Sequence, residues 1–415
     1  MSTLNLYNQQ AALNHVKNLA FKRRAASEGE TKVTNYIIKE LDKEKIQNTL
    51  ENFDWYTSSI ISTKLGFVFF FIYIFSYGTV SFYPHISWIY LSLDILYITI
   101  IYCGVKYSFG STRYIHFGKE KESKNVIATI QGTDLYPKRP VIIFSAHHDT
   151  ISQRYSMKMK IWLYRSALIL FLLLLILTFI LSITSLLNYF AVLQIDNIFL
   201  LLRNISLIIV VLLLINIALI LGNKNLDESI GSIDNASGTA ILLELARLIN
   251  KNPLEKSDVI FIWCGAEEVG YMGSKQYCLK HFEELNHDYD LNKSYNINID
   301  MVGTYLGLLD KTGLFKKRKI NLNLNNVLEI SANHQKISFK KENMVLGNFS
   351  DHKIFQAFAK KAGKNGFQIS VFNSDKDTKY IHSKRDTPDK CSITNLNSCI
   401  NICYNAIKSL DLRVE

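Results

Sequence analysis

The 415-residue sequence lacks features that mark several common classes of protein. No basic run is interleaved with aromatic residues, so the formal net charge of +11 does not indicate a nucleic-acid partner. None of the six cysteines forms a Cys-x-x-Cys pair, which favours scattered reduced thiols over a disulfide framework. No apolar core precedes Lys17, so we expect no cleavable signal peptide.

Formal charge is absent from two long stretches, between Lys64 and Asp94 and between Arg165 and Asp196. A soluble core helix is the alternative for any one apolar run, but a buried helix rarely needs so long an apolar surface on all sides. We therefore predict four transmembrane helices in two hairpins, and a lipid bilayer as a partner of the chain. The four runs lie at about 65–82, 86–105, 167–183 and 205–221.

Positive charge is distributed unevenly around these runs. The short connections near residue 84 and from 185 to 195 carry no Lys or Arg, whereas basic residues flank the opposite ends. By the positive-inside rule, those opposite ends are cytoplasmic. We therefore expect an integral multi-pass membrane protein whose remaining segments all lie on the cytoplasmic side. The flanking basic residues are Lys64, Lys106, Arg113, Lys158, Lys160 and Lys224.

Two charges interrupt the apolar runs, Asp94 in the second and Arg203 near the start of the fourth. Both runs return from the far side of the bilayer, and a simple count puts the two residues at similar depth. Because a single charge in hydrocarbon is costly, we hypothesise an intramembrane ion pair between them. Alternatively, the Arg203 side chain extends to the headgroups and its helix begins later.

Outside the apolar runs the sequence alternates between strand and helix patterns, which is typical of an α/β fold. Residues 311–341 are basic and rich in Asn, and they give no prediction. Buried strands are expected at 141–145, 259–264, 295–299 and 368–372. Helices are expected at 11–21, 28–43, 239–250, 274–285 and 393–410.

Two adjacent carboxylates, Glu267 and Glu268, follow the expected strand at 259–264. In open α/β sheets the ligand crevice lies just beyond the carboxyl ends of such strands. Adjacent side chains diverge, so one carboxylate can hold a cation while the other moves a proton. A solvated turn between strand and helix is the alternative for an isolated Glu-Glu pair.

Other carboxylates and two imidazoles also lie at expected strand ends or helix starts. Two imidazoles with three carboxylates are the ligand set expected for a pair of divalent, zinc-like ions that share one carboxylate. Asp149 could orient one imidazole as an outer partner. The joint placement of these residues, rather than any one of them, predicts a metal site. The candidate ligands are His147, Asp234, Glu268, Asp300 and His382.

Five motifs around these residues resemble, in order, those of the co-catalytic zinc peptidases. This M28-like family includes secreted bacterial leucine aminopeptidases and glutamate carboxypeptidase. A further stretch, with Arg24 and Ser27, resembles the start of the family's catalytic domain. The motifs are Ala146-His147-His148-Asp149, Asp234-Asn235-Ala236-Ser237-Gly238, Gly265-Ala266-Glu267-Glu268-Val269-Gly270, Ile299-Asp300-Met301, and His382-Ser383 with Asp386-Thr387.

The resemblance implies a mixed β-sheet sandwiched by helices, the zinc-exopeptidase fold, and two Zn²⁺ ions. One ion would be held by His147 and Asp300 and the other by Glu268 and His382. Asp234 would bridge the ions, and the catalytic residues would be Glu267, as general base, and Asp149. Ser350-Asp351-His352 resembles a family segment near the substrate pocket, without an assigned role.

The membrane hairpins distinguish this sequence from the soluble relatives and predict an active site at the membrane surface. The expected function is aminopeptidase cleavage of peptides, including membrane-associated signal or leader remnants. Three alternatives remain open: a carboxypeptidase or dipeptidase of the same family, a single-zinc glutaminyl-cyclase-like acyltransferase, and a non-enzymatic membrane scaffold. The acyltransferase does not use the full two-metal ligand set, and a scaffold has no need of Glu267. The expected divisions are catalytic segments at 1–63, 106–160 and 223–415 and hairpins at 64–105 and 161–222.

Overall fold

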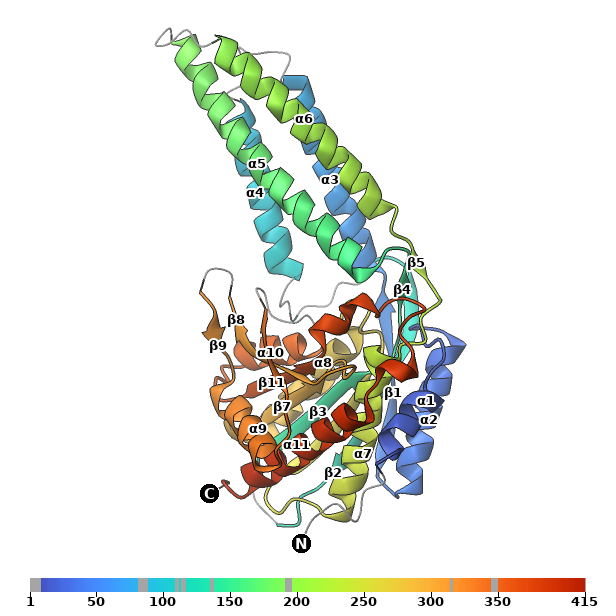
Figure 1. The fold of residues 1–415 in the computed structure, drawn as a ribbon. Helices are drawn as coiled ribbons and strands as arrows, with labels where there is room; N and C mark the ends of the chain where they lie inside the picture. The colour runs from blue at the N-terminus through green and yellow to red at the C-terminus, as the bar shows by residue number, and fades with distance from the viewer. Residues whose placement is uncertain are drawn as a thin grey trace. The chain divides into compact units, whose positions relative to one another are not determined.

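The computed structural model describes residues 9–80, 89–108, 112, 117–134, 138–190, 196–313, 316–344 and 350–414. The chain divides into two compact units. The first unit comprises residues 1–57, 112–153 and 225–415, and the second comprises residues 58–111 and 154–224 (Figure 1). The chain therefore leaves the first unit twice and returns to it twice.

The first unit is built on a nine-stranded mixed sheet in the order β1-β2-β6-β3-β7-β11-β8-β10, with β9 paired to β8. Strands β6, β3, β7 and β11 are mutually parallel, whereas β2 runs antiparallel to β6 and β8 runs antiparallel to β11. The strands are β1 (Asn48–Tyr56), β2 (Glu120–Ile130), β3 (Val141–His147), β6 (Asp258–Cys264), β7 (Tyr295–Ile299), β8 (Gly307–Thr312), β9 (Arg318–Lys319), β10 (Lys340–Met344) and β11 (Gln368–Asn373). A separate antiparallel ribbon joins β4 (Ser152–Gln153) to β5 (Asn225–Leu226).

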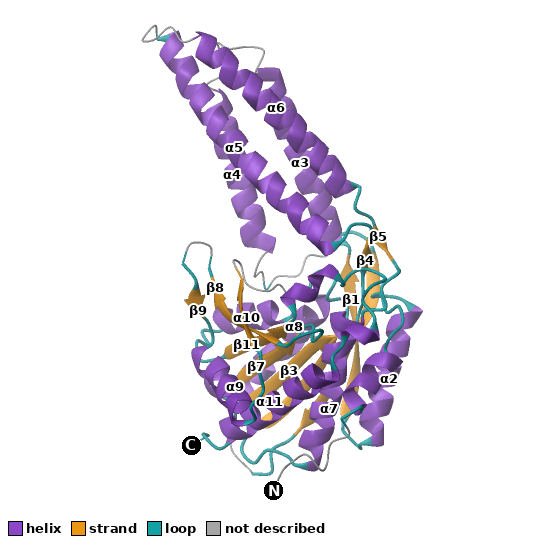
Figure 2. Cartoon of the chain, in the orientation of Figure 1, coloured by secondary structure: helices purple, strands orange, loops and turns teal. Residues whose placement is uncertain are grey.

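Helices cover both faces of this sheet, as Figure 2 shows, which confirms the predicted sandwich. Every residue of β6 is buried, and its side chains alternate between the two faces. Ile260 and Ile262 share a core cluster with residues of α8 and α10, whereas the Trp263 indole on the other face donates to the Thr239 carbonyl of α7. The helices are α1 (Ala11–Asn18), α2 (Glu28–Lys43), α7 (Ser237–Lys251), α8 (Met272–Asp288), α9 (Leu322–His334), α10 (His352–Lys361) and α11 (Ile393–Asp411), with short turns η3 (Ser232–Ala236), η4 (Leu291–Lys293), η5 (Asp375–Lys379) and η6 (Pro388–Lys390).

The register of the parallel strands determines where the site forms. His147, the last residue of β3, lies opposite Cys264, the last residue of β6. The segment that follows β6 therefore begins beside His147. Strand β7 pairs with the other edge of β3 and ends at Ile299, immediately before Asp300. The carboxyl ends of three adjacent strands thus meet at one edge of the sheet.

The second unit consists of four helices, α3 (Ser58–Val80), α4 (Ile89–Ser108), α5 (Met157–Tyr189) and α6 (Asp196–Leu221). Among the described residues, α5 and α6 are long and apolar enough to cross a membrane, whereas the apolar parts of α3 and α4 are shorter. Length and composition therefore support two of the four predicted spans. The predicted connection near residue 84, residues 191–195 of the second connection, and Arg113 lie outside the described residues.

The hypothesis of an Asp94–Arg203 ion pair is wrong for the structure as described. The buried Asp94 carboxylate accepts hydrogen bonds from the Tyr73 hydroxyl of α3 and the Thr178 hydroxyl of α5, each at 2.6 Å. Arg203 donates instead to the Asn204 side chain at 3.4 Å, and no ion pair joins it to Asp94 in this part of the chain. Two neutral donors satisfy the carboxylate, so it does not require the arginine.

We predict that Asp94→Leu destabilises the second unit, because the Tyr73 hydroxyl loses the carboxylate that accepts from it in an apolar interior. The Thr178 hydroxyl keeps the Leu175 carbonyl as an acceptor, at 2.9 Å. An unsatisfied hydroxyl in such a site costs about 1–3 kcal/mol. Asp94→Asn keeps an acceptor oxygen and should lose less. Thermal unfolding in detergent tests this, with Thr99→Val on the exposed side of α4 as the control. An Asp94→Leu protein as stable as the control would contradict the prediction.

Candidate active site

The five predicted ligands lie together at the carboxyl ends of the parallel strands. His147 ends β3, Asp300 follows β7, and Glu268 follows β6. Asp234 lies in the turn η3 that precedes α7, and His382 follows η5. All five side chains are at most 10% exposed. The structure thus gathers residues that are separated by more than half of the chain.

The ligands form two groups that share Asp234. In the first group, His147 Nε2 lies 3.1 Å from Asp234 Oδ1 and 3.4 Å from Asp300 Oδ1. In the second group, His382 Nε2 lies 3.1 Å from Asp234 Oδ2 and 3.0 Å from Glu268 Oε1. Each oxygen of the Asp234 carboxylate therefore faces a different histidine. This is the arrangement that a bridging carboxylate requires.

The donor set and its spacing fit divalent metal ions. Four ligands about 2.1 Å from a zinc ion in tetrahedral geometry lie roughly 3.4 Å from one another. The nitrogen–oxygen separations within each group, 3.0–3.4 Å, agree with this value to within a few tenths of an ångström. Imidazole nitrogen and carboxylate oxygen are ordinary zinc ligands, and each group leaves a coordination position for a further ligand.

The electrostatics of the cluster favour cations. Burial alone lowers the pKa of both histidines, but the carboxylates overcome this effect. They raise the pKa of His147 well above its usual value and that of His382 to about 10. Burial opposes ionisation of Asp234, yet the two imidazoles lower its pKa overall. Protonated imidazoles thus balance the carboxylates, and two divalent ions would displace those protons.

Glu267 lies in the same cluster but belongs to neither metal group. Its side chain is buried, and burial raises the pKa of its carboxyl well above the usual value. His147 opposes this shift, whereas nearby carboxylates, first Glu268, add to it. The preceding residue, Ala266, has a φ of +53°, a strained conformation that turns the chain at this point. A carboxyl with a raised pKa beside a cation site is suited to proton transfer.

The Asp149 carboxylate was predicted to orient the His147 imidazole, but its closer contacts are with the backbone of Glu267 and Glu268. Its carboxylate accepts from the backbone N–H groups of Glu267 at 3.0 Å and Glu268 at 3.3 Å. His147 Nδ1 lies 3.2 Å from the Asp149 backbone carbonyl and 3.6 Å from the carboxylate. Asp149 is therefore placed to hold the turn that carries Glu267, and its main chain orients His147.

Two further residues, Asp386 and Asn235, support Asp234; the sequence motifs contained both but gave neither a role. The buried Asp386 carboxylate accepts from the backbone N–H groups of Ile233 at 2.6 Å and Asp234 at 3.2 Å. Asn235 accepts from Gly238 N at 2.8 Å and donates to the Ile299 carbonyl at 2.8 Å. The position of Asp386 four residues after His382 is the one feature of the sequence that could have predicted its place beside the ligands.

The segment Ser350-Asp351-His352 lies beneath the cluster. Ser350 accepts a hydrogen bond from Asn298 of β7 at 3.0 Å. Asp351 is fully buried, which raises its pKa to about 6, and its charge also raises the pKa of Glu267. His352 opens α10, and burial lowers its pKa to about 3, so its imidazole is neutral. The segment adds a second buried carboxyl near Glu267.

The turn that carries Glu267 is also held from β2. Asn125 accepts from Gly265 N at 3.1 Å and donates to the Gly273 carbonyl at 2.9 Å. A side chain at Gly273 would meet the Gly265 carbonyl at 2.4 Å, so the two ends of the turn approach as closely as glycine permits. Beside them, the buried Glu30 accepts from the Ser123 hydroxyl and from Ala26 N at 2.6 Å.

We predict that Glu30→Gln stabilises the protein above neutral pH. Burial raises the Glu30 pKa from 4.5 to about 7, so the unfolded chain ionises at lower pH than the folded one. Stability is therefore lost as pH rises from 4.5 to 7, by roughly 3 kcal/mol at most. The amide oxygen of glutamine can still accept from Ala26 N, and its NH₂ group can donate to the Ser123 oxygen in place of the bond that Glu30 accepts from that hydroxyl. Unfolding measured between pH 5 and pH 8 should show a flatter profile for the variant; parallel profiles would contradict the prediction.

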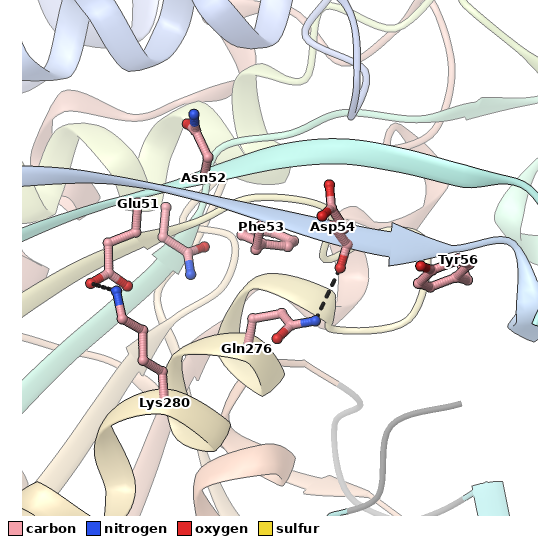
Figure 3. Close-up of a pocket in the computed structure, with 8 residues that line it drawn as sticks. Glu51, Asn52, Phe53, Asp54, Tyr56, Gln276 and Lys280 are labelled. Atoms are coloured by element: carbon pink, nitrogen blue, oxygen red, sulfur yellow. Dashed lines mark hydrogen bonds and ion pairs between the residues drawn. The ribbon is translucent and has the colours of Figure 1, made fainter. Parts of the chain in front are cut away.

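A separate cavity of about 320 Å³ lies between β1 and α8 and contains none of the predicted site residues (Figure 3). Two of its polar side chains, Glu51 and Lys280, pair with each other at 2.8 Å, and Gln276 donates to the Asp54 backbone carbonyl at 3.0 Å. We therefore place the candidate active site at the histidine–carboxylate cluster and not in this cavity.

A mixed sheet with two histidine–carboxylate groups at the ends of its parallel strands provides the ligands of a metal-dependent hydrolase. Residues 220–407 match the profile of peptidase family M28. Over 126 residues the chain is 36% identical to aminopeptidase YwaD of Bacillus subtilis (strain 168), a match that covers 30% of this chain and 26% of the relative. The chain thus spans about a quarter of that relative. Residues 220–407 therefore carry a peptidase family M28 domain.

Solved structures show the same fold at low sequence identity. An aminopeptidase from Aneurinibacillus sp. strain AM-1 has a TM-score of 0.55 at 14% identity, covering 96% of this chain and 93% of that one. A zinc aminopeptidase from Bacillus subtilis has a TM-score of 0.53 at 14% identity, covering 97% and 95%. An Acidobacteriales bacterium glutaminyl cyclase has a TM-score of 0.53 at 15% identity, covering 98% and 96%. The fold alone therefore accommodates both activities.

Proposed function

We propose that the protein is a zinc-dependent aminopeptidase that uses two zinc ions to remove N-terminal residues from peptides. The observation that carries this proposal is the Asp234 carboxylate, whose two oxygens each lie 3.1 Å from a different histidine. A single-zinc acyltransferase has no need of a second complete group. The names of the relatives, an aminopeptidase by sequence and a zinc aminopeptidase by fold, support the same choice.

Each site residue has a proposed role. His147 and Asp300 would hold one ion, Glu268 and His382 would hold the other, and Asp234 would contribute to both groups. Bound zinc lowers the pKa of a water molecule and polarises a carbonyl group. Glu267 takes the proton of the attacking water and gives it to the leaving amine. Asp149 accepts a hydrogen bond from Glu267 N and thereby fixes the backbone so that the Glu267 carboxylate faces the reacting atoms.

We also propose that the second unit anchors the protein in a bilayer through all four helices. Their interior contains a shared core that includes Tyr73, Leu174 and Leu213. Their exterior exposes large apolar residues such as Leu168 and Ile176, at 58% and 57%, which water would solvate poorly. The flanking basic residues support a cytoplasmic position for the peptidase unit within this proposal. Membrane-associated peptides are then the proposed substrates.

The test is release of free amino acids by detergent-purified protein from matched peptides with free or blocked N-termini. Chelator-sensitive release from free N-termini only supports an aminopeptidase. Release from the C-terminus supports a carboxypeptidase, and cyclisation of an N-terminal glutamine without hydrolysis supports the acyltransferase. A fully metallated protein that acts on no peptide contradicts the proposal. Unchanged cleavage of soluble peptides after residues 161–222 are replaced by a soluble loop counts against a substrate role for that hairpin.

A further inference from the structure

Arg23 is a fully buried arginine next to the cluster, but it contacts neither of the histidine ligands' rings. Its side chain is 0% exposed. All of its side-chain hydrogen bonds in the described structure go to backbone carbonyls, and no carboxylate there forms an ion pair with it. The acceptors are Leu19, Phe21 at 3.0 Å, His148 at 2.9 Å, Ile230 at 2.8 Å and Gly231 at 2.9 Å.

Three of these five acceptors belong to the segments that carry two of the ligands. His148 directly follows His147, and the Ile230–Gly231 pair leads into the turn that contains Asp234. One rigid guanidinium therefore links both ligand segments to each other and to the chain after α1. The five N–H groups of the guanidinium point in fixed directions. Arg23 therefore fixes the distance between these segments and does not merely connect them.

The main chain reinforces the same junction. Arg23 N donates to the Thr150 hydroxyl at 3.0 Å, and Thr150 N donates to the Arg23 carbonyl at 3.2 Å. Gly231 has a φ of +53°, and a Cβ there would lie 2.2 Å from a methyl group of Thr150 and 2.5 Å from the Asp234 carbonyl. The backbone segments at Arg23, Thr150 and Gly231 are therefore packed so closely that no larger side chain fits at Gly231.

The charge of Arg23 is costly at this position. Burial lowers its pKa to about 10, although Asp386, Asp149 and Asp234 raise it, so the group stays charged at neutral pH. An apolar side chain could fill the volume without this cost. A role in packing alone does not explain why a cation is buried here, whereas fixing polar backbone next to ligands does.

We propose that Arg23 is a positioning residue that sets the distance between His147 and Asp234 and thereby the affinity of the site for zinc. This inference rests on the proposed function, because it assumes that these residues bind zinc. Lysine keeps the charge but presents one nitrogen, which cannot bridge the same carbonyls.

The test measures zinc affinity of full-length, detergent-purified Arg23→Lys by competition with a chromophoric chelator, together with thermal unfolding. Arg139→Lys is the matched control, because Arg139 donates to the Gly132 carbonyl at 3.1 Å and pairs with Asp258 at 2.9 Å near the amino end of β3. We expect Arg23→Lys to weaken zinc binding by about 10- to 100-fold, as loss of outer partners of metal ligands does. Arg139→Lys should lower stability and leave zinc affinity unchanged.

A purely structural role would lower the unfolding temperature of both variants and leave both zinc affinities at the wild-type value, and this result overturns the proposal. If Arg23→Lys does not fold, Thr150→Val removes the hydroxyl that accepts from Arg23 and should also weaken zinc binding. Wild-type affinity in folded Thr150→Val likewise overturns it. A wild-type protein that binds zinc but cleaves no peptide contradicts the peptidase function, while the zinc affinities still decide the role of Arg23.

Discussion

Glu267→Gln is expected to lower kcat by about 10²- to 10⁴-fold, the contribution typical of a positioned general base. Glutamine has nearly the same shape and still accepts a hydrogen bond, but it cannot take a proton. Glu267 is in neither metal group, so zinc content should stay at the wild-type level. KM should change little, because the lost interaction acts on the proton in the transition state and not on bound substrate.

The measurement is steady-state peptide cleavage combined with metal analysis of the same samples. Glu283→Gln is the control, because it makes the same chemical change on the exposed surface of α8. Full activity in Glu267→Gln would remove Glu267 from the mechanism. Loss of activity accompanied by loss of zinc would instead indicate that Glu267 supports the ligands and is not the base.

The candidate ligands could be located from sequence because each lies beside an element with a strong local pattern. The predicted strand 259–264 differs from observed β6 by one residue at its start, and Glu267 and Glu268 lie three and four residues after its end. Strand β7 was expected with the bounds that it has, which put Asp300 at its end. Since neighbouring parallel strands end at one edge, local patterns were sufficient to bring these residues together without knowledge of strand order.

Long-range hydrogen bonds could not be predicted in this way. Nothing in the local sequence distinguishes Arg23 from Arg24, and only the fold brings Arg23 to Gly231, which is 208 positions away. The same contacts account for the early end of α1 at Asn18, where the sequence pattern suggested a helix to residue 21. The Leu19 and Phe21 carbonyls accept from the Arg23 guanidinium instead of continuing the helix.

In the region 311–341, buried polar residues interrupt the apolar pattern by which a helix is predicted from sequence. Helix α9 (Leu322–His334) buries Leu324, Val327 and Leu328 at helical spacing, but asparagines interrupt the pattern. Asn325 is itself buried, where it donates to the carbonyls of Leu309 at 2.9 Å and Ile320 at 3.3 Å. A polar residue is needed at position 325 because these carbonyls, from β8 and from the chain before α9, require a donor. The local sequence does not reveal these contacts.

Asp234→Ala is expected to have the largest effect of any single substitution, because it removes one ligand from each metal group. We expect both zinc ions to bind more weakly by more than about 100-fold, the upper value for loss of outer partners alone. Cleavage should fall to the level of chelator-treated wild-type protein. Zinc per chain, measured after dialysis at fixed free zinc, should be lower than in any other single ligand variant.

The comparison with Asp300→Ala and Glu268→Ala makes this test specific. Each of these residues belongs to one group, so each variant should lose one ion and keep the other. Asp227→Ala is the control, because it removes a carboxylate from an exposed side chain a few residues before Asp234. Equal zinc loss in Asp234→Ala and Asp300→Ala would mean that Asp234 serves one ion only. The two ions would then share no ligand, which contradicts the bridged site on which the two-zinc peptidase proposal rests.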